Sequence, residues 1–241
     1  MAQVINTNVA SLFAGAALNK SANALQVAQQ RLSSGLRINS VADDSTGLAI
    51  ASGYDTQIRG TNVAIRNAND AITQAQTLDG YAGQVLSNLQ RLYEIFVQTG
   101  DVANDESDAL VAENARIATL SGTSDLIGAD VTVDGSGTTV AAQSTAIATL
   151  SGATAADVLD DIDDLIATRS LFGADIATFS SAVATMQTTS VNLSASYSRI
   201  MDTDYAAETT SMTRNQILQQ AGIASLAQSN QNPSMVLSLL R

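Results

Sequence analysis

Apolar residues recur at alternating steps of three and four between residues 162 and 200. This spacing gives one helix a continuous apolar stripe for a partner helix, as in a coiled coil. The stripe contains two registers of seven-residue steps, Ile162, Arg169, Ile176, Val183, Ser190 and Tyr197 in one, and Leu165, Phe172, Phe179, Met186, Leu193 and Ile200 in the other. Thr154 and Asp157 form a capping pattern. We therefore predict a long helix from about Thr154 to about Ile200.

A second stripe of the same spacing runs from residue 65 to residue 96. Its registers are Ile65, Ile72, Asp79, Leu86 and Tyr93, and Ala68, Ala75, Ala82, Leu89 and Phe96. Helices of this kind reach about 50 to 60 Å at about 1.5 Å per residue, and each needs an equally long partner. Each of the two is the best candidate for the other. The pattern predicts a mainly α fold, a long antiparallel helical bundle or coiled coil.

Weakly charged helices are predicted at both ends of the chain. The first is predicted to be capped by Asn6 or Thr7 and to end near Gly35. Its apolar face includes Leu12, Leu18, Leu25 and Leu32. The last helix is predicted to end before Asn232–Pro233, because the residue before a proline disfavours helix. Both helices are rich in Ala, Leu and Gln and have too little bulk to fold alone. We predict that they pair with each other or with neighbouring copies.

The segments between these helices contain turn residues. Residues 36–53 predict an ordered connector, with helix resuming at about Tyr54. A break is predicted at Thr99–Asp101, followed by a shorter helix that stops at Ser121–Gly122. Between residues 128 and 142, two strand-like runs flank a glycine-rich turn, which predicts a small β-hairpin.

Composition and charge exclude several classes of function. The chain has no Cys and no His, so it lacks disulfides, thiolate nucleophiles, Cys/His zinc sites and an imidazole base. The net charge of −12 is concentrated in residues 61–201, which predicts a solvated surface there and no nucleic-acid partner. No apolar run is long enough for a bilayer, so no membrane association is expected.

Motifs near both ends of the chain resemble those of bacterial flagellins. They are Ala2–Asn8, Gln30–Ser40, Asp43–Asp44, Gly47–Ala51, Arg66–Asp70, Ser198–Ile200, Asp204–Ala206, Gln216–Gly222 and Val236–Arg241. The resemblance covers residues 1–100 and 155–241 and is highly specific. The segment 121–153 is too short for the outer domains that many flagellins carry, which implies a short form with little beyond the hairpin.

The resemblance implies four regions. They are an inner-tube N-terminal helix at 1–40, a connector at 41–56, an outer-tube helical bundle at 57–201 with the hairpin near 128–142, and an inner-tube C-terminal helix at 202–241. In the family, the two chain ends pair along the inner tube of the filament.

The same resemblance implies a structural subunit that polymerises helically into the bacterial flagellar filament, without enzymatic activity or cofactors. The chain would leave the cell through the flagellar channel without a cleaved signal, and be extracellular. Its implied partners are many copies of itself, the export apparatus, a flagellin chaperone, and the cap and hook–filament junction proteins. The alternative within this architecture is a hook–filament junction protein, and a monomeric coiled-coil adaptor is a further rival.

Candidate interface residues follow from these helices. For self-assembly we expect contributions from Leu12, Leu18, Leu25, Arg31, Leu32, Asn39, Ile217, Leu218, Ala221, Leu239 and Leu240. By resemblance, a Toll-like receptor would contact Arg91, Glu94, Ile95 and Glu113. Tyr93, Phe96 and Ala177–Thr178 depart from the family pattern near that surface, and the alternative for it is packing on a neighbouring subunit.

Acidic residues at two places raise the question of a metal or catalytic site. Asp157, Asp160, Asp161 and Asp164 lie near the start of a predicted helix. Carboxylates are favourable there because of the helix dipole, and the alternative is a weak divalent-cation site. Asp43 and Asp44 are expected to make turns or subunit contacts, because no base or metal partner accompanies them. We expect no catalytic, cofactor or metal site.

Overall fold

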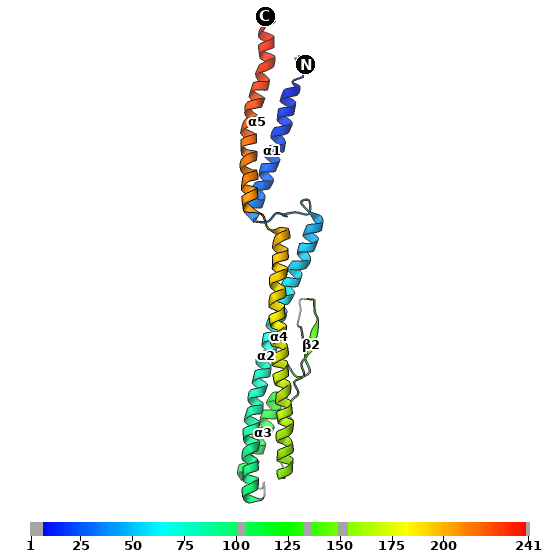
Figure 1. Ribbon diagram of the computed structural model, residues 1–241, viewed down its shortest axis with the longest axis vertical. Helices are drawn as coiled ribbons and strands as arrows, with labels where there is room; N and C mark the ends of the chain where they lie inside the picture. The colour runs from blue at the N-terminus through cyan, green and yellow to red at the C-terminus, as the bar shows by residue number, and fades with distance from the viewer. Residues whose placement is uncertain (1–6, 101–104, 133–135, 149–153, 240–241) are drawn as a thin grey trace. The chain divides into compact units, whose positions relative to one another are not determined.

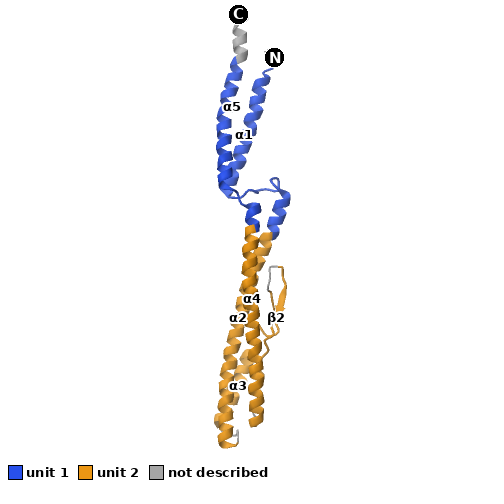
Figure 2. Ribbon diagram, viewed as in Figure 1, with its two compact units in different colours: residues 1–53, 196–241 blue, residues 54–195 orange. Residues whose placement is uncertain are grey.

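The computed structural model describes residues 7–100, 105–132, 136–148 and 154–239, with side chains through residue 231. In that part of the chain the elements are α1 (Val9–Ser34), α2 (Ser45–Thr99), α3 (Asp105–Gly122), β1 (Asp130–Thr132), β2 (Thr139–Ala141), α4 (Ala155–Met201) and α5 (Tyr205–Leu239). Two compact units divide these elements (Figure 2): a terminal unit of residues 1–53 and 196–241, and a central unit of residues 54–195. The predicted mainly α fold is confirmed.

In the central unit, α2 and α4 lie side by side and share one hydrophobic core (Figure 1). The residues of α4 that are buried in this core follow seven-residue steps: Val158, Leu165, Phe172, Phe179 and Met186. Ile162, Ile176 and Val183, from the other predicted register, are half-buried against the same core. Both predicted registers of α4 are therefore confirmed, one central to the core and one at its edge.

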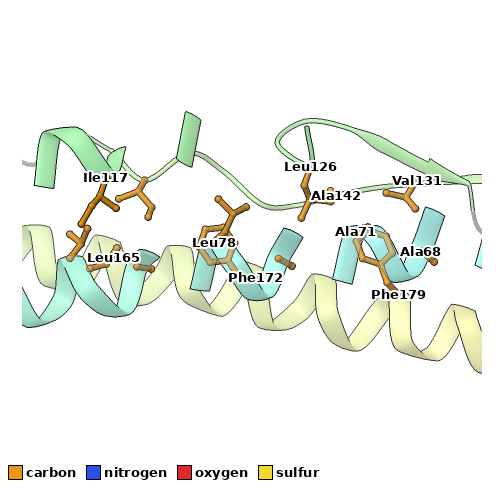
Figure 3. Close-up of a cluster of buried hydrophobic side chains, with 14 of the residues drawn as sticks. Ala68, Ala71, Leu78, Ile117, Leu126, Val131, Ala142, Leu165, Phe172 and Phe179 are labelled. Carbon is orange, nitrogen blue, oxygen red and sulfur yellow. The ribbon is translucent and has the colours of Figure 1, made fainter. Parts of the chain in front are cut away.

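On α2 both predicted registers lie against the core, and a third register that was not predicted is buried with them. Ala68, Ala75, Ala82 and Leu89 are buried as predicted. Ile65, Ile72, Leu86 and Tyr93, from the other predicted register, are half-buried against the same core. The register that was not predicted is fully buried and consists of Ala64, Ala71, Leu78, Val85 and Leu92. Residues of α3 and the hairpin region, including Ile117, Leu126 and Val131, join the same cluster (Figure 3). α2 therefore packs against several segments, and its buried face is wider than the face that a single partner helix would cover.

The predicted hairpin is present, with β1 antiparallel to β2 and Val131 opposite Val140. The buried carboxylate of Asp175, on α4, holds the chain that follows β2. It accepts hydrogen bonds from the backbone N–H groups of Gln143 (2.9 Å) and Ser144 (2.8 Å), and from the Ser144 hydroxyl. A buried carboxylate requires such donors. Asp175 therefore ties the hairpin segment to the helical core.

Two helix starts show how capping residues set the boundaries. The Thr154 hydroxyl accepts the N–H of Asp157 (3.2 Å), in agreement with the predicted start of α4. In contrast, α2 begins at Ser45 and not near Tyr54, so that prediction was wrong. The Asp44 carboxylate accepts the N–H of Gly47 (2.8 Å) and caps the helix there. A Cβ at Gly47 would lie 2.3 Å from Asp44 Oδ2, so this glycine allows the cap and is no sign of a connector.

In the terminal unit, α1 and α5 pair in antiparallel orientation (Figure 1). The N-cap of α1 is Asn8, not Asn6 or Thr7, and its side chain accepts the Ser11 N–H. The helix ends as predicted at Gly35, whose left-handed φ of 73° favours glycine. α5 continues past Asn232–Pro233 to Leu239, which overturns the predicted end. A proline removes one backbone hydrogen bond, and that loss did not end the helix.

The two chain segments that lead into α2 and α5 are joined by backbone hydrogen bonds. The Thr203 N–H donates to the Gly35 carbonyl (2.9 Å), and the Arg37 N–H donates to the Met201 carbonyl (2.6 Å). Beside them, a small cluster buries Ile38, Ala51 and Met201. This junction lies wholly within the terminal unit and fixes the base of the helix pair.

Candidate functional site

The paired helices α1 and α5 bury little apolar surface in a single chain. Ala28 is the buried residue of α1, and α5 has none between Tyr205 and residue 231. Large apolar side chains instead face solvent, with Leu12 67%, Phe13 78% and Ile217 60% exposed. Contiguous exposed apolar faces are typical of surfaces that bind other proteins.

The structure places the predicted self-assembly residues in two groups. Leu12, Asn39, Ile217, Leu218 and Ala221 are exposed. Leu18, Leu25, Arg31 and Leu32 are half-buried. The backbone of Leu239 lies in α5 but its side chain is outside the described residues, as is the whole of Leu240. Leu18, Leu25 and Leu32, which are spaced seven residues apart, thus lie at the edge of the contact between α1 and α5. Other residues form the outward face of the pair.

Sequence reasoning missed several residues of that outward face. Val9, Phe13, Tyr205 and Ile223 are each more than half exposed. They fall outside the seven-residue pattern that drew attention to the leucines. Phe13 could have been found from composition, because it is one of only four Phe residues in the chain and lies in a helix too poor in bulk to bury it.

At the base of the helix pair, Arg31 and Asn39 have different roles. Arg31 Nη1 lies 3.7 Å from Glu208 Oε2 across the pair, while its Nε is buried without a hydrogen-bond partner in the single chain. The Asn39 side chain donates to the Ser34 hydroxyl (2.8 Å). Arg31 therefore links α1 to α5, and Asn39 shapes the turn after α1.

The turn after Asn39 is closed by Asp43, whose carboxylate accepts the N–H groups of Asn39 (3.1 Å) and Ser40 (2.9 Å). These backbone hydrogen bonds lower the pKa of Asp43 below its usual value, because they favour the charged form. Asp43 and Asp44 therefore each hold backbone, one in a turn and one at a helix start, and this accounts for the pair without any catalytic role.

On the central unit, the residues singled out for receptor contact are unequally accessible. Arg91 is exposed and pairs with Glu106 (2.9 Å) and Glu94 (3.1 Å), and these hydrogen bonds raise its pKa. The pKa of Glu113 is lowered by its hydrogen bonds to Arg116. Ile95 is only 5% exposed and offers a partner little surface.

The described residues contain no group of three or more His, Cys, Asp or Glu side chains placed to hold a metal ion. The acidic residues at the start of α4 follow its N-terminal cap, where the helix dipole favours negative charge. None of the helices, over the residues that were described, is both long and apolar enough to cross a membrane.

Comparison with known protein families identifies the two helical regions. Residues 5–138 match the bacterial flagellin N-terminal helical region, and residues 156–240 match the C-terminal helical region. The chain belongs to the bacterial flagellin family. It is therefore a subunit of the flagellar filament, a structural protein of bacterial motility that lies outside the cell, and it is not an enzyme.

Individual flagellins show how far the likeness extends. Flagellin of Halalkalibacterium halodurans is 37% identical over 273 residues, covering 99% of this chain and 100% of that protein. Flagellin 1 of Proteus mirabilis is 33% identical over 365 residues, with both chains fully covered. Phase 2 flagellin of Salmonella typhimurium is 52% identical over 108 residues, or 45% of this chain and 21% of that protein. The alignments longer than 241 residues show that the relatives carry residues without a counterpart here.

Proposed function

We propose that copies of this flagellin add to one another through the exposed apolar faces of α1 and α5. The observation that carries this proposal is the outward placement of Leu12, Phe13 and Ile217 on helices that bury almost nothing within one chain. Burying one such side chain contributes about 1.5 to 3 kcal/mol, and a helical polymer repeats each contact at every subunit. Residues 1–40 and 202–241 then form the inner-tube domain, and residues 57–201 the outer-tube bundle.

The same faces supply contacts for the other proposed partners. An exposed apolar helix must be covered before assembly to avoid aggregation, which supports binding of α5 by a flagellin chaperone in the cell. Export apparatus, cap and hook–filament junction proteins are proposed partners for the same reason, since each meets the chain before or at the end of polymerisation. A hook–filament junction role for this chain itself has no support from the comparisons, which name flagellins.

Contact with a Toll-like receptor remains a proposal for the exposed part of the central unit. Arg91 and Glu94 are both accessible, and their charges can pair with a partner surface. Such a surface has to be built from the charged residues Arg91, Glu94 and Glu113, because their side chains are accessible whereas Ile95 is buried. Loss of receptor signalling with Arg91→Ala, but not with Ile95→Val, would support it.

Seeded polymerisation tests the assembly proposal. Purified monomer is added to short filament seeds, and the critical concentration is measured with negative-stain electron microscopy as a check on filament form. Leu12→Ser and Ile217→Ser should each raise the critical concentration at least about ten-fold, because each removes a side chain that is buried on assembly. A chain lacking residues 1–34 should form no filaments.

Gln26→Ser is the matched control, because Gln26 is an exposed polar residue of the same helix. It should polymerise like the unaltered chain. Circular dichroism of each monomer should show the central unit intact, since Leu12 and Ile217 are exposed in the single chain. If Leu12→Ser and Ile217→Ser polymerise as readily as Gln26→Ser, these faces are not the assembly surface.

A further inference from the structure

A proline lies inside α5, and one backbone hydrogen bond of the helix is therefore missing. In an α-helix, each N–H donates to the carbonyl four residues earlier. Pro233 has no N–H, and it lies within the helix Tyr205–Leu239. The carbonyl of Ser229, four residues earlier, is therefore denied its usual donor.

Asn8 supplies a donor to that same carbonyl. Its side-chain Nδ2 donates to the Ser229 carbonyl oxygen at 2.8 Å, from a residue 221 positions away in the sequence. The contact is partly buried. The hydrogen bond that proline removes from α5 is thus replaced from α1.

The other end of the same amide caps α1. Asn8 Oδ1 accepts the N–H of Ser11 at 3.1 Å, and Asn8 is the N-cap residue of the helix. Capping alone would be served by Ser, Thr or Asp. Donating to Ser229 at the same time requires a donor atom separate from the acceptor atom that caps the helix. Among these side chains only the amide of Asn has both, because Asp has no donor and Ser or Thr has a single hydroxyl oxygen. The Asn8 side chain therefore hydrogen-bonds two backbone groups that have no partner within their own helices, one at the start of α1 and one inside α5.

Near the junction, the Arg31–Glu208 ion pair and the backbone hydrogen bonds of Gly35 and Arg37 fix how the C-terminal end of α1 is placed along α5. These contacts do not reach the N-terminal end of α1, where Asn8 lies. Leu18 packs against Gly222, where a Cβ would lie 3.3 Å from Leu18 Cδ1, and both helices present mostly small side chains. Contacts of this kind are easily exchanged for similar ones when one helix moves along the other. A slip by one helical turn shifts Asn8 about 5.4 Å along α5, beyond hydrogen-bond reach of Ser229.

We infer that Asn8 and Pro233 together hold the N-terminal end of α1 in register with α5, while the junction holds the other end, and that filament assembly requires this register. Because of Pro233, the Ser229 carbonyl lacks a backbone donor within α5. Asn8 is the positioning residue that donates to this carbonyl. The inference rests on the proposed role of the α1·α5 pair as the assembly surface. A pair in another register would present Leu12 and Ile217 in the wrong relative positions to neighbouring copies.

A double-mutant cycle tests the pairing. Asn8→Ser keeps a good N-cap and removes the Nδ2 that donates to Ser229, because the serine side chain ends one atom short of that position. Pro233→Ala restores the backbone N–H for Ser229. In the full chain, Asn8→Ser should raise the critical concentration for seeded polymerisation about five-fold, in line with one lost hydrogen bond and an unsatisfied carbonyl. In the Pro233→Ala chain, the same change should raise it less than about two-fold.

Cross-linking reports the register itself. A Cβ at residue 222 would lie 3.8 Å from Leu18 Cβ, which is close to the separation found in disulfides, and the chain has no other Cys. In filaments, Leu18→Cys with Gly222→Cys should cross-link readily, whereas Leu18→Cys with Leu226→Cys, one turn away, should not. Adding Asn8→Ser should lower the first yield several-fold and raise the second.

The outcomes separate this inference from the assembly proposal. If Asn8→Ser is equally harmful with and without Pro233, or harmless in both, the register inference is overturned, even though Leu12→Ser still blocks polymerisation. An unchanged cross-linking pattern in Asn8→Ser filaments overturns it as well. If Leu12→Ser polymerises normally, the assembly proposal fails, whatever the cycle shows.

Discussion

The central and terminal units are both made of long helices rich in small residues, yet they differ in how far their large apolar side chains are buried. In the central unit, Phe172 and Phe179 are fully buried between α2, α4 and the hairpin region (Figure 3). In the terminal unit, Phe13 is 78% exposed. The central unit therefore contains its own core, and the terminal unit has surface that only other molecules can cover.

This difference shows that helix pairing alone does not make a stable fold. α2 and α4 gain a third layer from α3 and the hairpin, which closes over their small residues. α1 and α5 have no such layer within one chain. If copies pair through these helices as proposed, their stability depends on that contact, and effects of mutation should differ between the two units.

The largest expected difference comes from a central aromatic residue. Phe172→Ala should lower the free energy of unfolding of the central unit by about 3 to 5 kcal/mol, because it leaves a cavity in the core. Urea unfolding followed by circular dichroism measures this. Leu12→Ala is the control in the terminal unit and should change monomer stability by less than about 0.5 kcal/mol. Similar losses from both changes would contradict the contrast between the units.

A second, smaller effect concerns the attachment of the hairpin segment. Asp175→Ala should cost about 1 to 3 kcal/mol, because it leaves the buried N–H groups of Gln143 and Ser144 without an acceptor. Asp175→Asn keeps one acceptor oxygen and should cost less. Amide hydrogen exchange at residues 143 and 144 should accelerate in the Ala variant. Unchanged exchange there would show that the hairpin segment is held by its apolar contacts alone.

A third effect sharpens the difference between buried and partly exposed polar contacts in the central unit. Arg169 pairs with Asp79 at 2.7 Å, but the two side chains remain 36% and 41% exposed. Solvent screens such a pair, so Asp79→Asn should cost less than about 1 kcal/mol, and the cost should shrink further in high salt. A loss as large as that of Asp175→Ala would show that this pair contributes as much as a buried one.

The smallest effect is a pH dependence in the terminal unit. Because the N–H groups of Asn39 and Ser40 lower the pKa of Asp43, its charged form stabilises the turn at pH values above the ordinary carboxyl pKa of about 3.9. This stabilisation is lost as the pH falls through the lowered pKa. Nuclear magnetic resonance should show the Asn39 and Ser40 amides titrating with a midpoint below about 3.9, and Asp43→Asn should abolish that titration. A midpoint at or above that value would contradict the contact.

Periodicity in the sequence predicted the long helices well, because a helix that packs against one main partner has apolar residues at regular spacing along one face. It located both registers of α4, and capping chemistry located its start at Thr154. On α2 the same reasoning located two registers and missed a third, because additional partners widen the buried face. It failed at Ser45, where a glycine that accommodates the Asp44 cap resembled a loop signal.

The candidate interface was only partly predictable for a related reason. Seven-residue steps mark Leu18, Leu25 and Leu32, which lie along the contact within one chain. Residues on the outward face, such as Phe13, need not share that period. The contact between Asn8 and Ser229 could not be read from the sequence, because it depends on how residues 221 positions apart align.

The central claim is that the terminal helices obtain their stability from neighbouring copies, while the central unit folds alone. Amide hydrogen exchange of the same full chain, as dilute monomer and as filament, tests this most directly. We predict fast exchange in residues 9–34 and 205–231 of the monomer and strong protection in the filament, with the core of residues 64–92 and 158–186 protected in both. Equal protection of the terminal helices in the dilute monomer would contradict the claim.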